Sequence, residues 1–192
     1  MKIYIILFLV FGISSCNQNR GKESEGEIQT QEVSPIPEGY NPEARLKELG
    51  ISLSSPSAPV ANYVNAVRTG NLVFLAGKGP LKLDGQNITG KLGTDLTIEQ
   101  GYEAARITGI NQLSVLKAEL GNLNTVKRIV KVLGMVNSSP DFTDQPKVVN
   151  GYSDLMVQVF GEKGKHARAA VGMGALPGNI AIEVEMIVEV YE

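Results

Sequence analysis

The strictest pattern in this chain is an alternation of side chains over residues 180–190, close to the C-terminus. The even-numbered positions carry only Ile, Val and Met, whereas the odd-numbered positions include Glu183, Glu185 and Glu189. Successive side chains of a strand point to opposite faces of a sheet. The pattern therefore predicts a strand with one apolar face, which needs a core, and one charged face.

A second strand-like run lies just before it, within residues 166–177, and carries Arg168 among small side chains. The Gly- and Pro-containing turn between the two runs favours a hairpin. If the runs pair in that way, Arg168 and a carboxylate of the next strand share one surface. Such a pair is a minimal arrangement for holding a small anion and directing a water molecule at it.

The remaining periodic segments alternate between strands and helices. A long segment, residues 98–120, is predicted to be a helix that Thr97 caps and Gly121 ends. The other predicted elements are a short helix at 43–49, a hairpin of strands 62–67 and 72–76 with its turn at 68–71, a turn at 84–85, a strand at 126–136 and a helix at 144–160. We therefore expect an α+β fold, a mixed sheet with two helices packed on one face. The uncovered face of such a sheet predicts self-association.

Residues 1–15 are typical of a lipoprotein signal peptide. Lys2 precedes an apolar run at 3–13, which is shorter than the about 20 residues that a membrane-spanning helix needs. The run ends in Ile-Ser-Ser-Cys, which resembles a bacterial lipobox, and Cys16 is the only cysteine. We expect Cys16 to be lipidated and to anchor the protein to a membrane of the bacterial cell envelope, on its periplasmic or surface face. The alternative is an ordinary secretory signal with an incidental cysteine.

The region after the signal divides into a tether and one domain. Residues 16–42 begin with Cys16 and continue as a polar segment with few large apolar side chains, which predicts a flexible tether. Residues 43–192 form a single domain that is long enough to bury a sizeable core.

Charge and composition exclude several classes of function. The formal net charge is −2, from 18 Lys and Arg against 20 Asp and Glu, and the chain has no Trp, so tight nucleic-acid binding is not expected. One His and one Cys leave no cluster of ligands for a metal ion, so no metal site is expected.

A series of short segments connects these elements to a known family. They are residues 58–67, 70–77, 149–152, 167–168, 176–177 and 182–185. In order and spacing the series resembles the RidA/YjgF family, imine deaminases long described as endoribonuclease L-PSP. No single segment is specific, but together they cover nearly the whole predicted domain, from Pro59 to Val190. The segments at 141–146 and 159–161 resemble a divergent branch.

The resemblance implies a chorismate-mutase-like fold and a homotrimer whose three sheets face inward as a barrel. Small 2-imino acids or their enamine tautomers are then hydrolysed in clefts between subunits, without metal or cofactor. By position, Arg168 matches the residue that binds the substrate carboxylate, and Glu183 matches the acid that positions a water molecule. The substrate-binding residues carried over in the same way are Tyr63, Gly77 and Asn150.

Two positions depart from the family pattern. Ala170 stands where the family usually has Cys, and Lys78 replaces the Gln of a Ser-Gly-Gln segment. We nevertheless count Ala170 and Lys78 among the residues that line the substrate cleft. Lys78 either strengthens anion binding there or points to solvent.

Each candidate has an ordinary structural alternative. Arg168 can be an ion-pair partner, Glu183 a solvated or paired strand carboxylate, and Tyr63 a residue of interface packing. His166, the only histidine, invites a general-base role, although its position is not catalytic in the family. For the protein as a whole, the alternative is a binding protein that holds small carboxylates at Arg168 without turnover. A ribonuclease is the third possibility, against which the acidic balance argues.

Overall fold

The computed structural model describes residues 35–191. Along the chain its elements are α1 (Pro42–Glu48), β1 (Ala66–Thr69), β2 (Leu72–Lys78), α2 (Ile98–Leu120), η1 (Leu123–Thr125), β3 (Val126–Asn137), α3 (Gln145–Phe160), η2 (Gly161–Gly164), β4 (Ala167–Met173), η3 (Pro177–Asn179) and β5 (Ile182–Val190). The predicted signal peptide, Cys16 and most of the predicted tether lie outside the described residues. Within residues 35–191, no helix is both long and apolar enough to cross a membrane.

The five strands form one mixed sheet in the order β1-β2-β5-β3-β4. β4 pairs with β3 in parallel, and all other neighbours are antiparallel. The predicted α+β class with a mixed sheet is confirmed, whereas the predicted hairpin of the two last strands is wrong. β3, α3 and β4 form a β-α-β unit, whose crossover brings β4 next to β3. β3 therefore separates β4 from β5, which pairs with its other edge.

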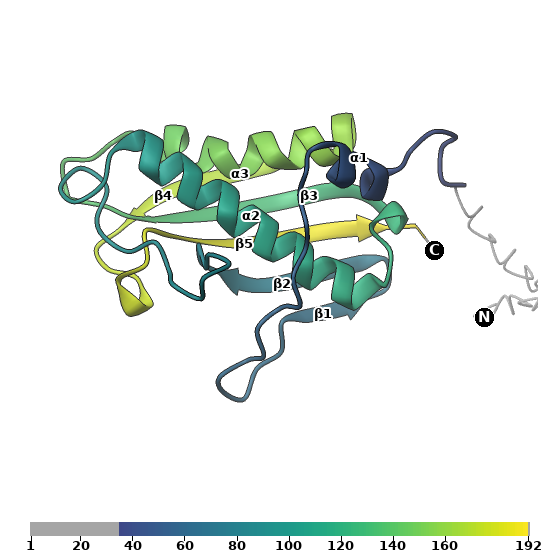
Figure 1. Ribbon diagram of the computed structural model, residues 1–192, viewed down its shortest axis with the longest axis horizontal. Helices are drawn as coiled ribbons and strands as arrows, with labels where there is room; N and C mark the ends of the chain where they lie inside the picture. Colours follow the sequence, from purple (N-terminus) through teal and green to yellow (C-terminus); the bar gives the residue numbers. More distant parts are fainter. Residues whose placement is uncertain (1–34, 192) are drawn as a thin grey trace, which may run out of the picture. The chain divides into compact units, whose positions relative to one another are not determined.

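The two long helices lie over the same face of the sheet, as Figure 1 shows. α2 has the predicted bounds, because Thr97 and Gln100 form a capping box at its start and Gly121, with φ 74°, ends it. The predicted alternation of the last strand is also confirmed. Its buried residues are Ile182, Val184, Met186, Val188 and Val190, which face the helices, while the residues between them are more exposed.

The two helices pack closely at a glycine. A Cβ atom added to Gly151 of α3 would lie 2.0 Å from the backbone oxygen of Tyr102 of α2. Neither helix backbone can move aside without disturbing the core beneath it. Gly151 therefore fixes the distance between the helices, and through α3 it fixes the position of every side chain that α3 presents to the sheet.

The first strand begins later than predicted. β1 covers Ala66–Thr69 instead of residues 62–67, and the hairpin turn reduces to Gly70 and Asn71. Just before β1, the Asn65 side chain donates to the Ser57 carbonyl and accepts from Lys78 Nζ.

The opposite face of the sheet has no cover within residues 35–191, and the sheet is open, with β1 and β4 at its edges. Apolar side chains are exposed there: Val67 is paired with Phe74, and Phe74 with Ile187. Val67 and Phe74 are 55% and 41% exposed. We call this surface the open face.

Candidate functional site

Arg168 lies on the helix-covered face of the edge strand β4. Its neighbour across the sheet is Val132 of β3, which in turn pairs with Met186 of β5. Met186 accepts a hydrogen bond from the Tyr152 hydroxyl of α3, with 3.2 Å between sulfur and oxygen. Because directly paired residues share one face of a sheet, Arg168 points toward α3.

Two neutral side chains of α3 hold the Arg168 guanidinium. Nη1 donates to Asn150 Oδ1 at 2.9 Å and to Ser153 Oγ at 3.0 Å. These bonds use both protons of Nη1 and leave three of the five N–H groups of the side chain free. Among the ion pairs of residues 35–191, none involves Arg168. The guanidinium is thus oriented by its own chain while its charge is not neutralised.

Ser153 connects Arg168 to the only histidine. His166 Nε2 lies 3.0 Å from Ser153 Oγ, and His166 Nδ1 lies 2.7 Å from the Gly164 carbonyl oxygen. A carbonyl can only accept, so Nδ1 carries the proton, and Nε2 of the neutral ring accepts from the Ser153 hydroxyl. Ser153 then has only lone pairs to offer Arg168. Burial lowers the pKa of His166, and the charge of Arg168 lowers it further, so the ring is neutral at pH 7.

Glu183 lies on the open face, on the other side of the sheet from Arg168. It pairs with Met135 and alternates with the buried Val184. Its side chain covers Gly77 of β2, where an added Cβ atom would come within 2.0 Å of Glu183 Oε1. Burial raises the pKa of Glu183, and the neighbouring Glu185 raises it further. The carboxylate makes no ion pair within the described part of the chain.

Lys78 and Tyr63 belong to neither the group around Arg168 nor the group around Glu183. A bulge after Leu75 brings Lys78 opposite Val184, and so onto the helix-covered face. Lys78 Nζ donates to Asn65 Oδ1 at 2.6 Å. Tyr63 precedes β1 in a loop and is 49% exposed. Neither side chain forms a hydrogen bond or an ion pair with Arg168 or Glu183.

The predicted site residues thus do not form one cluster within one chain. Arg168, Asn150 and Ala170 gather at the edge strand, and Ala170 packs against the core two residues after Arg168 on the same face. Glu183 and Gly77 lie on the open face. Ser153 was missed by the sequence prediction, although it follows Asn150 by three residues, the spacing of neighbours on a helix surface. No group of three or more His, Cys, Asp and Glu side chains suited to a metal ion occurs within residues 35–191.

Comparisons with known proteins match this fold along nearly its whole length. A family model described as "YjgF/chorismate mutase-like, putative endoribonuclease" matches residues 43–190. Protein TCP17 of Trypanosoma cruzi is 46% identical over 147 residues, which are 76% of this chain and 92% of that protein. The family match runs from α1 to the last residue of β5, so it includes the complete sheet and both long helices.

Two solved structures are similar to the chain as well. A protein of unknown function from Agrobacterium tumefaciens is 41% identical, with a TM-score of 0.72, and the match covers 78% of this chain and 92% of that one. A "putative endoribonuclease" from Shewanella oneidensis is 32% identical, with a TM-score of 0.75, and the match covers 78% of this chain and 99% of that one.

Proposed function

Because the chain belongs to the YjgF/RidA family, we propose that it hydrolyses small 2-imino acids, or their enamine tautomers, to 2-keto acids and ammonia. The reaction consumes one water molecule: the C=N bond is replaced by C=O, and the nitrogen leaves as ammonia. A protonated imine carbon is already electrophilic. The protein then has to hold the substrate and to position and deprotonate the water.

The observation that carries the proposal is that Arg168 is held in place while its charge is not neutralised. Its guanidinium is held by Asn150 and Ser153, both neutral, and it has no carboxylate partner within residues 35–191. Three free N–H groups on a planar, oriented cation suit the two oxygens of a carboxylate. A substrate carboxylate therefore binds there without displacing a resident anion.

Glu183 is the group proposed to handle the water. Burial and the neighbouring Glu185 raise its pKa, which makes the carboxylate a stronger base than an ordinary glutamate. As the water oxygen attacks the imine carbon, Glu183 accepts the water proton. Gly77 leaves room above the sheet for the carboxylate, since any larger side chain would occupy that space.

Arg168 and Glu183 lie on opposite faces of one sheet, so one chain does not bring both to a single substrate. We propose that the protein is a homotrimer in which the cleft is completed by a neighbouring subunit. The exposed apolar side chains of the open face support self-association, because contact between subunits would remove Val67 and Phe74 from water. The trimer is typical of the family.

A binding protein without turnover is the second candidate. It is favoured by one specific observation: Arg168 has its complete set of supporting bonds without Glu183 or a second subunit. Ala170, which replaces the family's Cys, is consistent with either candidate. The endoribonuclease description fits this chain less well, because its formal net charge is −2 and nucleic-acid binding requires an excess of cations on one surface.

We also propose that Cys16 is lipidated and holds the domain at a membrane of the cell envelope, with residues 17–42 as the tether. The lipobox-like sequence supports this proposal. Mass spectrometry of the mature N-terminus is the test. A diacylglyceryl-modified Cys16 is expected, and an unmodified mature terminus at any other residue contradicts the anchor.

Imino acids generated in the assay by an amino acid oxidase provide the test of the enzymatic proposal. Free imino acid is trapped with semicarbazide, and the purified protein is expected to compete with the trap. Arg168→Ala should lose this competition. If no imino acid is consumed while small carboxylates still raise the melting temperature in an Arg168-dependent way, the binding protein is the correct alternative.

A further inference from the structure

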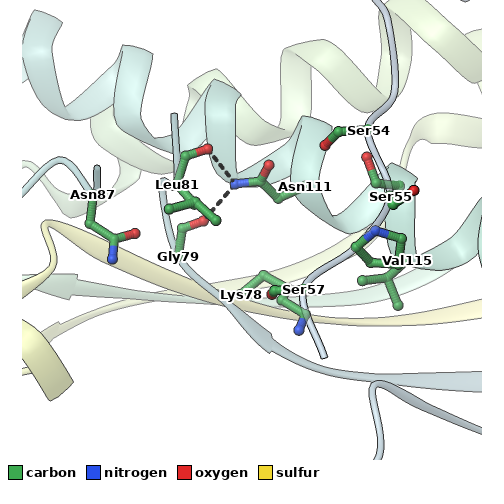
Figure 2. Close-up of a pocket in the computed structure, with 11 residues that line it drawn as sticks. Ser54, Ser55, Ser57, Lys78, Gly79, Leu81, Asn87, Asn111 and Val115 are labelled. Atoms are coloured by element: carbon green, nitrogen blue, oxygen red, sulfur yellow. Dashed lines mark hydrogen bonds between the residues drawn. The ribbon is translucent and has the colours of Figure 1, made fainter. Parts of the chain in front are cut away.

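A polar cavity lies away from Arg168 and Glu183, between the segment at 54–57, the end of β2 and the middle of α2 (Figure 2). Its volume is about 190 Å³. The hydroxyl groups of Ser54, Ser55 and Ser57 line one side, and Lys78 lies beside Ser57. Neither Arg168, Asn150 nor Glu183 contributes to its wall, so the cavity is separate from the groups of the proposed catalytic site within one chain.

Lys78 is the only charged side chain that lines this cavity. Its Nζ bonds to the neutral Asn65, and Lys78 takes part in none of the ion pairs of residues 35–191. Burial lowers the pKa of Lys78, because the ammonium group is half removed from water without an anion nearby. Two of its three N–H groups remain available to a ligand. The cavity therefore presents an uncompensated positive charge.

The opposite wall, formed by α2, offers acceptors. The Asn111 amide nitrogen donates to the carbonyls of Gly79 and Leu81, both at 3.0 Å, and Figure 2 shows the side-chain oxygen of Asn111 turned away from those bonds. Ser114, which is buried, donates its hydroxyl proton to the Ile110 carbonyl at 3.1 Å. Asn111 Oδ1 and Ser114 Oγ can then only accept from a ligand, so this wall suits hydroxyl groups.

We propose that this cavity binds a small hydroxylated monocarboxylate. Its carboxylate would meet Lys78 Nζ, and its hydroxyl groups would donate to Asn111 Oδ1 and Ser114 Oγ. A volume of about 190 Å³ corresponds to about six water molecules at roughly 30 Å³ each, which matches an acid of three or four carbons. One lysine without an arginine fork or a second cation favours a single carboxylate over a doubly charged phosphate.

Calorimetric titration with glycerate is the test. It is carried out on the Arg168→Lys protein and repeated on Arg168→Ala, so that the first carboxylate site does not dominate the signal. Propionate, which lacks the hydroxyl groups, glycerol, which lacks the charge, and inorganic phosphate are the matched probes. We expect glycerate to bind about 10- to 100-fold more tightly than either propionate or glycerol.

Lys78→Met should weaken glycerate binding about 10- to 100-fold, since it removes a charge-assisted hydrogen bond. Lys82→Met is the control, because Lys82 pairs with Asp84 on the surface and does not line the cavity. Affinity should also fall as the pH rises through the lowered pKa of Lys78. Equal binding by propionate, tighter binding of phosphate, an unchanged affinity in Lys78→Met, or no binding of glycerate each overturns the proposal. These outcomes are distinguishable from a failure to hydrolyse imino acids, because Arg168, Asn150 and Glu183 do not line this cavity.

Discussion

Arg168 and Glu183 lie on opposite faces of the sheet, and their charged groups are held in different ways. On the helix-covered face, Arg168 is held by two side chains of α3, and one of these is held in turn by His166. On the open face, Glu183 has Gly77 beneath it and no ion-pair partner within residues 35–191. The Arg168 guanidinium is positioned by side chains of its own chain, whereas no ion pair within residues 35–191 positions the Glu183 carboxylate.

In the proposed cleft between subunits, this difference assigns substrate binding to Arg168 and the handling of water to Glu183. A preorganised cation binds the substrate carboxylate without a further ordering cost, which is useful in the step that determines affinity. A carboxylate with freedom to move can adjust to a water molecule and to a neighbouring chain. The contrast predicts that changes on the helix-covered face alter folding or affinity, whereas changes on the open face alter turnover.

The largest effect is expected for Glu183→Gln, which removes the proposed base while keeping its shape. Turnover of imino acids should fall about 10²- to 10⁴-fold, the usual contribution of a general base. The thermal stability at pH 7, by contrast, should rise. The raised pKa means that the fold favours the protonated carboxyl, so this contribution is present below the ordinary pKa of about 4.3 and is lost as the pH rises through the raised pKa. Glu183→Gln should therefore melt at a higher temperature than the wild type at pH 7 and at the same temperature at pH 3.

Glu185→Gln is the matched control, because Glu185 lies on the same face two residues later and is exposed. Its turnover should stay close to that of the wild type. If Glu183→Gln hydrolyses imino acids at the wild-type rate, the carboxylate has no part in the reaction and the open face is only an interface.

The same Gly→Ala substitution on the two faces tests the contrast in rigidity. At Gly151 the new methyl group meets the backbone of Tyr102, and at Gly77 it meets the flexible end of Glu183. Gly151→Ala should destabilise the protein by about 3 kcal/mol, the upper part of the range for overpacking, because the gain of up to about 1 kcal/mol in helix propensity is smaller than the cost of separating α2 from α3. Gly77→Ala should cost less than about 1 kcal/mol, since the carboxylate can move.

Urea unfolding measures the two free energies, and the imine assay measures turnover. Gly77→Ala is expected to fold normally and to lose turnover, because Glu183 is displaced. Equal destabilisation at both positions would show that the open face is packed as tightly as the helix-covered one and would remove the basis of the comparison.

Arg168→Lys tests whether substrate binding depends on the planar, oriented guanidinium of Arg168. Lysine keeps the charge but lacks the planar fork and cannot bond to Asn150, Ser153 and a carboxylate in the same geometry. We expect kcat/KM to fall about 10- to 100-fold, mainly through KM, since a hydrogen bond to a charged group contributes about 1.5–3 kcal/mol. Arg128→Lys on β3, which alters an ion pair with Glu189 of β5, is the control and should leave kcat/KM unchanged. A fall in kcat with an unchanged KM would place Arg168 in the chemical step instead of in binding.

Some of this architecture was accessible from the sequence because local signals determine it. α2 begins and ends where Thr97 and Gly121 predict, since capping depends on residues within one turn of the helix end. The faces of β5 follow from its strict alternation. β4 lacked such a signal: Ala167, Ala169 and Ala170 are small and apolar on both faces, so its sequence does not show which side Arg168 occupies.

The positions of the candidate residues depended on contacts between distant segments. The pairing of β4 with β3 instead of β5 follows from the crossover through α3, and a prediction from neighbouring runs cannot include it. It separates Arg168 from Glu183 in the chain. The role of Ser153 requires the side chains of α3, β4 and the loop before β4 to be placed together.

The smallest effect is expected for His166→Gln, because His166 acts on Arg168 only indirectly, through Ser153. Above pH 7 the variant should be less stable by about 1 kcal/mol, since the partly buried hydrogen bond to the Gly164 carbonyl is lost. The lowered pKa of His166 means that its contribution is present above the ordinary histidine pKa of about 6.5 and is lost as the pH falls through the lowered value. The wild type should therefore lose stability below pH 6.5 more steeply than the variant, and the two unfolding free energies should converge toward pH 5.

Urea unfolding at pH 8, 6.5 and 5 measures this, with KM for the imino acid followed in parallel. Curves that stay parallel at all three pH values would mean that His166 has the same pKa in the folded and unfolded states, which contradicts a lowered pKa in the fold.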